Sequence, residues 1–171
     1  SRTTVAVESY TGGDEFENLI TTDTSRVIVN DTIDTVYVKI VNDSQVTEGD
    51  GNNLTHKLML VDENGNAVSV PSGEHLVVQL TYQMGSGLED ADFEINPDNS
   101  QIKTVDVHLT NGMSEIDITN IVKDDLIDEN NESYVLSIGI IDDLLGQTFE
   151  NIEAHPTDNS VTGTIIDNDP D

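Results

Sequence analysis

The densest group of side chains capable of chemistry lies between residues 124 and 132, where five carboxylates occur within nine residues. No Lys or Arg follows Lys123 in this stretch to pair with them. Carboxylates gathered so closely repel one another strongly unless a cation lies among their oxygen atoms. The stretch therefore predicts a divalent-cation site, with a solvated acidic loop as the alternative.

Calcium is the cation that these residue types favour. It takes about six to eight oxygen ligands, tolerates irregular geometry, and is bound by carboxylates, Asn side chains and backbone carbonyls. Zinc is bound by His and Cys instead. The chain contains no Cys, which also excludes a disulfide scaffold and a cysteine nucleophile.

The charge balance points the same way. The chain of 171 residues has 34 Asp and Glu against 6 Lys and Arg, a formal net charge of −28. A nonspecific nucleic-acid surface needs many cations and is excluded. No apolar run is long enough to cross a bilayer, and the start of the chain does not resemble a signal peptide. If the chain folds, its counter-charge must come from solution.

The elements that must position these carboxylates are β-strands. Only 35% of the residues are hydrophobic, but they gather in short runs that alternate with polar residues, which is typical of half-buried strands. The predicted strands cover residues 36–41, 54–60, 75–82, 104–109, 116–121, 134–141 and 161–166. Turn signals at 63–66, 71–73 and 111–112 separate them. This spacing predicts an all-β fold, an antiparallel sandwich.

The two ends of the chain resemble one another. Phe16-Glu17-Asn18-Leu19 and Phe149-Glu150-Asn151-Ile152 are each followed by Thr-Asp-x-Ser, a β-run and an acidic stop. We interpret residues 1–34 as the tail pattern of a preceding repeat or as an extra edge hairpin, and residues 35–171 as a complete unit. A segment of 34 residues could hardly bury a core alone.

Four motifs in order resemble Calx-beta repeats: VTEGD at 46–50, DF at 92–93, DDLIDENNESY at 124–134 and VTGTIIDND at 161–169. LTH at 54–56, GNAV at 65–68 and PSGE at 71–74 are similar to repeats of giant bacterial RTX adhesins. The resemblance covers about residues 36–170. It implies an immunoglobulin-like sandwich whose loops at one end bind calcium.

The resemblance also implies a set of metal ligands, all carboxylates. They are Glu48, Asp92, Asp124, Asp125, Glu129, Glu132, Asp167 and Asp169. Loops at one pole of a sandwich come from strands far apart in sequence, so Glu48, Asp92, Asp124 and Asp167 can converge there. Tyr134 matches the aromatic residue that follows the second Glu of the family pattern.

Weaker signals favour structural roles. Residues 62–66 resemble the start of a calcium loop, but Ala67 stands where such a loop needs Gly, so we expect a hairpin turn. Asp142 and Asp143 could bind an ion or cap a turn, and we favour the turn. The four His, at positions 56, 75, 108 and 155, are spaced singly, and we expect them to face solvent.

Two functions compete, both in adhesion and neither enzymatic. The first is a calcium-stabilised, rigid stalk unit of a large secreted RTX adhesin that supports surface adhesion and biofilm formation, with adjacent modules as partners. The second is a module that itself captures a peptide or glycan on a target surface through a calcium-dependent site. Clustered carboxylates could imitate a glycosidase pair, but groove aromatics are scarce. The resemblance implies an extracellular location reached by type I secretion.

Overall fold

The computed structural model describes residues 2–5, 25–28, 34–49, 51–85, 102–124, 126, 128–143 and 148–169. The chain divides into two compact units, Ser1–Ile33 and Asp34–Asp171. In the first unit, β1 (Arg2–Val5) pairs antiparallel with β2 (Ser25–Ile28) in a sheet of two strands. Whether this unit is the tail of a preceding repeat or an edge hairpin stays a prediction.

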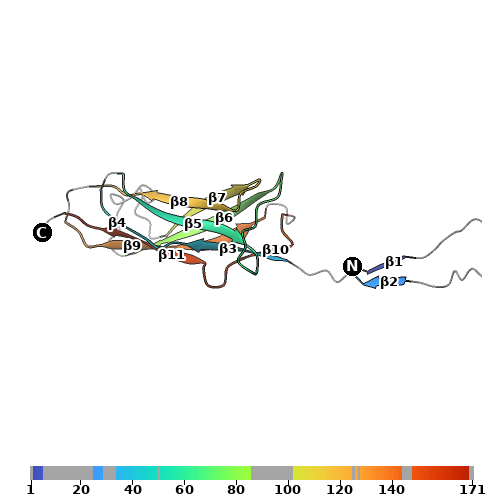
Figure 1. The fold of residues 1–171 in the computed structure, drawn as a ribbon. Coiled ribbons are helices and arrows are strands. Elements are labelled where there is room, and N and C mark those ends of the chain that lie inside the picture. Colours follow the sequence, from blue (N-terminus) through green and yellow to red (C-terminus); the bar gives the residue numbers. More distant parts are fainter. Residues whose placement is uncertain are drawn as a thin grey trace, which may run out of the picture. The chain divides into compact units, whose positions relative to one another are not determined.

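The second unit is a sandwich of two sheets, which confirms the predicted all-β class (Figure 1). The four-stranded sheet has the order β10 (Asn151–Ala154), β3 (Thr35–Val41), β5 (Asn53–Val61) and β8 (Glu115–Ile121). The five-stranded sheet has the order β4 (Ser44–Thr47), β11 (Ser160–Ile166), β9 (Glu132–Asp142), β6 (His75–Met84) and β7 (Ile102–Thr110). In the described residues, no helix is long and apolar enough to span a membrane.

Two short edge strands, β4 and β10, were not predicted. Each has four residues, too few for an alternating pattern to stand out. Both pair in parallel, β4 with β11 and β10 with β3, whereas the other pairs are antiparallel. The predicted antiparallel sandwich is therefore correct except at these two edges.

The core lies between the two sheets and follows the period of two expected of strands. Leu76, Val78, Leu80 and Tyr82 on β6 were predicted to share one face, and all four are fully buried. Alternate residues of β3 and β5 face them from the opposite sheet. Each such aliphatic side chain contributes about 1.5 to 3 kcal/mol by leaving water.

A polar network crosses this core. The Tyr82 hydroxyl donates to Asn120 Oδ1 (3.0 Å), and Asn120 Nδ2 donates to the Tyr134 hydroxyl (2.6 Å). His56 Nε2 lies 2.7 Å from that hydroxyl, and His56 Nδ1 lies 2.6 Å from the Asn42 carbonyl. A carbonyl only accepts, so Nδ1 carries the proton and Tyr134 donates to Nε2. The neutral ring thus satisfies both partners.

The prediction that His56 faces solvent is wrong. Its side chain is fully buried, as its shared parity with Leu54, Leu58 and Leu60 required. Burial lowers the pKa of His56, outweighing the hydrogen bond to Asn42 and the charge of Asp43, which raise it. Burial also raises the pKa of Tyr82 to about 12, although its hydrogen bond to Asn120 opposes the change.

The predicted turn roles are confirmed for Asp62 and Asp143. Asp62 Oδ1 accepts the backbone N–H groups of Asn64 and Asn66, both at 2.8 Å, which closes the turn after β5. The hydrogen bond from the Asn66 side-chain amide to Oδ2 (2.9 Å), together with these backbone bonds, lowers the pKa of Asp62. The carboxylate of Asp143 accepts the N–H groups of Thr148 and Phe149, so it fixes the backbone that leads into β10.

Candidate metal centre

The ends of three strands meet at one edge of the five-stranded sheet. β4 and β11 run in parallel, with Thr47 opposite Ile166, so the residues that follow them emerge side by side. The N–H of Glu48 donates to the Ile166 carbonyl (2.8 Å), which continues the ladder by one residue. β9 is antiparallel to β11 and begins where β11 ends, with Glu132 opposite Ile165. The pairing itself therefore brings carboxylates from distant parts of the sequence together.

Three of these carboxylates form a compact cluster. Glu48, Asp167 and Asp169 each contribute one oxygen atom, and the three atoms lie within 4.8 Å of one another. Glu48 is 7% exposed, and Oδ2 of Asp169 is shielded from solvent. At an effective dielectric constant of about 20, unit charges within 4.8 Å repel by roughly 3 kcal/mol per pair. The cluster is therefore unfavourable without a counter-charge.

Two Asn side chains that we did not predict organise this cluster. Asn168 Nδ2 donates to the Glu48 carbonyl (2.9 Å) and, more weakly, to Asp124 Oδ1 (3.4 Å). Asn131 Oδ1 accepts the N–H of Asp167 (3.3 Å). Asn168, which follows β11, thus contacts both Glu48, which follows β4, and Asp124, which follows β8. The only sequence signal for it was its position between two Asp residues.

The turn after β4 holds Glu48 at the cluster. Asn52 Nδ2 donates to the Thr47 carbonyl (2.7 Å), and its N–H donates to the Gly49 carbonyl (3.0 Å). Gly49 has a φ of 150°, and a Cβ atom there would lie 3.1 Å from Asn52 Nδ2. A side chain at this position would strain the turn and displace the Asn52 amide. The Gly of the VTEGD motif therefore has a backbone role.

The cluster rests on the core through β9 and β11. Tyr134, two residues after Glu132, lies opposite Gly163, four residues before Asp167. A Cβ atom on Gly163 would overlap the Tyr134 ring, so only Gly fits beneath it. The ring also contacts Tyr82 and His56 edge to face. The aromatic residue of the predicted motif is thus a structural support behind the carboxylates.

The eight predicted ligands fall into three groups. Glu48, Asp167 and Asp169 are together. Asp124 is linked to them through Asn168, and the buried Glu132 begins the strand beside β11. The half-buried Glu129 lies three residues before Glu132. Asp92 and Asp125 lie outside the described residues. That these carboxylates bind metal stays a prediction.

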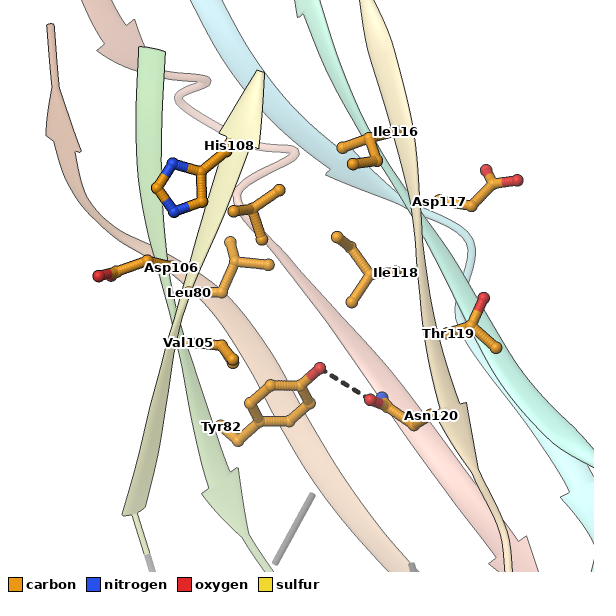
Figure 2. Close-up of a pocket in the computed structure, with 11 residues that line it drawn as sticks. Leu80, Tyr82, Val105, Asp106, His108, Ile116, Asp117, Ile118, Thr119 and Asn120 are labelled. Atoms are coloured by element: carbon orange, nitrogen blue, oxygen red, sulfur yellow. Dashed lines mark hydrogen bonds between the residues drawn. The ribbon is translucent and has the colours of Figure 1, made fainter. Parts of the chain in front are cut away.

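A second feature is a gap between the sheets where two edge strands face each other. Val105 of β7, with Leu80 and Tyr82 of β6, lies opposite Ile116, Ile118 and Asn120 of β8 (Figure 2). The gap has a volume of about 420 Å³. Inward residues of β7 and β8 are only partly buried for this reason, except Leu109 and Asn120.

Comparison with known proteins identifies the fold. The chain is similar to the apo-form Calx CBD1 domain, with a TM-score of 0.53, 14% identity and coverage of 81% of this chain and 100% of that one. It is also similar to CBD12 from CALX1.2 (TM-score 0.52, 14% identity, 79% of this chain) and to calcium binding domain CBD12 of CALX1.1 (0.53, 14%, 78%). It spans 46% of each of the latter two chains.

No protein-family model and no curated protein matches the chain. At 14% identity, the structural likeness shows the fold alone. The second unit is therefore a β-sandwich of the Calx-beta type, as the sequence resemblance predicted.

Proposed function

We propose that this chain is a calcium-binding module, with the metal held at the joined ends of β4, β9 and β11. The observation that carries the proposal is the cluster of Glu48, Asp167 and Asp169, whose oxygen atoms lie within 4.8 Å of one another. Oxygen atoms bound to one calcium ion at about 2.3 to 2.6 Å are separated by no more than about 5 Å. The cluster fits this limit.

The donor set favours calcium over other cations. Every predicted ligand is a carboxylate, and Asn side chains and backbone carbonyls lie beside them. Such oxygen donors suit calcium, whereas a zinc site would be expected to include His or Cys. The solved structures of the same fold include a calcium binding domain of CALX1.1, which adds support from outside the chain.

Calcium binding would stabilise the folded unit. β4 is a four-residue edge strand, and in the five-stranded sheet it pairs only with β11. An ion shared by Glu48 and the residues after β11 would join these two strand ends and remove their repulsion. An ion that binds the folded state better than the unfolded one adds its binding free energy to folding.

We propose further that the module is a rigid stalk unit of a large secreted bacterial RTX adhesin, extracellular, non-enzymatic and joined to similar modules. The motifs at 54–56, 65–68 and 71–74 support this assignment, as does the likeness between the two ends of the chain. In the second unit, the chain enters beside β10 and leaves past β11 at the opposite pole (Figure 1). This end-to-end path suits a linear array, with calcium close to the exit.

A thermal melt followed by circular dichroism tests the calcium site. It compares millimolar calcium, chelator, and magnesium at matched ionic strength. We expect calcium alone to raise Tm by about 10 °C, the effect of about 2 to 3 kcal/mol. Asp167→Asn should lose most of this rise. Asp62→Asn, which removes a carboxylate in a turn at the end of β5, is the matched control and should keep it.

Coincident curves in all three solutions would refute a calcium site. An equal loss in the Asp167 and Asp62 variants would show that total charge, not a site, governs stability. The stalk role is tested separately by small-angle scattering of two consecutive modules of the parent protein, expressed as one chain. An extended particle that becomes flexible in chelator supports it, whereas independent tumbling in calcium contradicts it.

The gap between β7 and β8 favours a second candidate function, capture of a ligand. Its partly exposed apolar lining, with Val105, Ile116 and Ile118, suits an extended peptide better than a glycan. Binding of a surface-peptide library should fall with Ile118→Asp and not with Thr104→Asp, at an exposed position of β7 that does not line the gap. Equal binding by both variants would eliminate the gap as the ligand site.

A further inference from the structure

Two His that are far apart in sequence meet on the outer face of the five-stranded sheet. A hydrogen bond of 3.0 Å joins His75 Nε2 and His108 Nδ1, with ring centroids at 5.0 Å and planes at 12°. The prediction that the four His occur singly is therefore wrong for this pair. The register explains their meeting, since His75 lies opposite Thr110 and His108 opposite Val77, one diagonal step away.

We propose that His75 and His108 form a binding site for a divalent transition-metal ion, with copper(II) the best fit. Both rings offer a nitrogen atom, and imidazole nitrogen is a preferred ligand of copper, nickel and zinc. This site differs from the acidic pole in its ligands, its location and the metal it selects. It does not depend on the calcium proposal.

The separation of the two nitrogen atoms is compatible with chelation of one ion. Two metal–nitrogen bonds of about 2.05 Å place their nitrogen atoms about 2.9 Å apart at a right angle and about 3.3 Å apart at the tetrahedral angle. The observed 3.0 Å lies within this range, and it is the length of the hydrogen bond that the ion would replace. Copper(II) is the best fit because it binds nitrogen sites most strongly among the divalent first-row metals. Small ring rotations would turn both lone pairs from each other toward a common ion.

The backbone beneath the pair is well fixed. β6 and β7 pair without interruption from His75 opposite Thr110 to Gln83 opposite Ile102. β6 also pairs with β9 on its other side. The two imidazoles are therefore presented by a ladder rather than by a loop, so little order has to be gained on binding.

Carboxylates on the same face provide a negative potential. Asp106 lies two residues from His108, and both side chains are on the side of β7 away from β8 (Figure 2). Gln79 Nε2 donates to Asp106 Oδ1 (3.2 Å), which orients that carboxylate. Asp106 and Asp142 also line a hollow of about 200 Å³ above Val77. These charges attract a cation to the surface that carries the pair.

Copper titration of the whole chain, with millimolar calcium as a competitor at the carboxylates, tests the proposal. We expect one copper ion per chain with a two-nitrogen signature in the electron paramagnetic resonance spectrum. His75→Gln and His108→Gln should each weaken binding about tenfold or more, because chelation by the second ring is lost. His155→Gln removes an imidazole elsewhere and should bind as the unaltered chain does.

A second measurement uses the unaltered chain, so that it does not depend on how the variants fold. Copper should protect His75 and His108, but not His155, from acylation by diethyl pyrocarbonate, read by mass spectrometry. An oxygen-only spectrum would overturn the proposal. So would tight binding by His75→Gln and His108→Gln, or equal protection of His155.

Discussion

The core network and the acidic cluster are two polar sites connected by the paired strands β9 and β11, but they balance their charges in different ways. In the core, His56, Asn120 and the two Tyr are neutral, and the hydrogen bonds between them each join a donor to an acceptor. At the pole, three carboxylates lie within 4.8 Å of one another. The first site is satisfied by the protein itself, whereas for the second we propose a cation from solution.

This difference divides the stability of the unit into two parts. Substitutions in and around the network should lower Tm equally in calcium and in chelator. Substitutions at the pole should change the difference between the two solutions. Tyr134 stands two residues from Glu132, so the network is also the rigid support on which the carboxylates are mounted. Four predictions test this division, beginning with the largest effect.

Gly163→Ala should be the most damaging. The new Cβ atom would overlap the Tyr134 ring, which is held by His56 and Asn120 and cannot move aside. Overpacking of this kind costs about 3 kcal/mol or more. The loss should be the same in calcium and in chelator, measured by urea unfolding. Thr164→Ala, one residue along β11, is the control, and similar stability of both variants would disprove the close approach.

Tyr134→Phe should have the next largest effect. It removes one hydroxyl and leaves His56 Nε2 without its donor and Asn120 Nδ2 without its acceptor, both inside the core. Two buried groups that lose partners cost about 2 to 4 kcal/mol together. Tyr37→Phe, at a partly buried tyrosine in the same sandwich, is the control. A clearly larger loss in calcium than in chelator would join the network to the metal site and remove the proposed division.

Asp167→Asn should show the opposite pattern. In chelator the variant should be as stable as the unaltered chain or more stable, because one of three mutually repelling charges is gone. In calcium it should be less stable by about 1 to 3 kcal/mol, because a ligand is lost. The variant should therefore melt at the same temperature as the unaltered chain, or higher, in chelator, and at a lower temperature in calcium. A variant that is less stable in both solutions would show that Asp167 has a structural role.

The strands of the core were predictable from the sequence, since residues such as Leu76, Val78 and Leu80 alternate over a long run. The short edge strand β4 was not, although it delivers Glu48 to the pole. The acidic residues were found by type and by family resemblance. Asn168 was missed because its role depends on hydrogen bonds to the backbone of Glu48 and to Asp124, which no sequence pattern records.

The His residues show where type and position conflict. His56 has the parity of the buried Leu54 and Leu58, but as a polar residue it was expected in solvent, and position proved the better guide. His75 and His108 meet only because β6 and β7 pair in one register. A shift of that register by a single residue would place one ring on the opposite face.

The smallest effect should come from mild acid acting on His56. Burial lowers the pKa of His56 in the folded state, whereas the unfolded chain titrates near the ordinary value of about 6.5. The unfolded state therefore binds more protons, so this contribution to stability is complete above about pH 6.5 and is lost as the pH falls below it. The slope cannot exceed about 1.4 kcal/mol per pH unit for one group. Protonation would also turn Nε2 into a donor and leave the Tyr134 hydroxyl without its acceptor.

Urea unfolding between pH 7.5 and 5.5 in chelator should show this loss of stability. His56→Gln should reduce the dependence of stability on pH, whereas His155→Gln should not. An equal slope in all three proteins would assign the acid sensitivity to the carboxylates rather than to the core network.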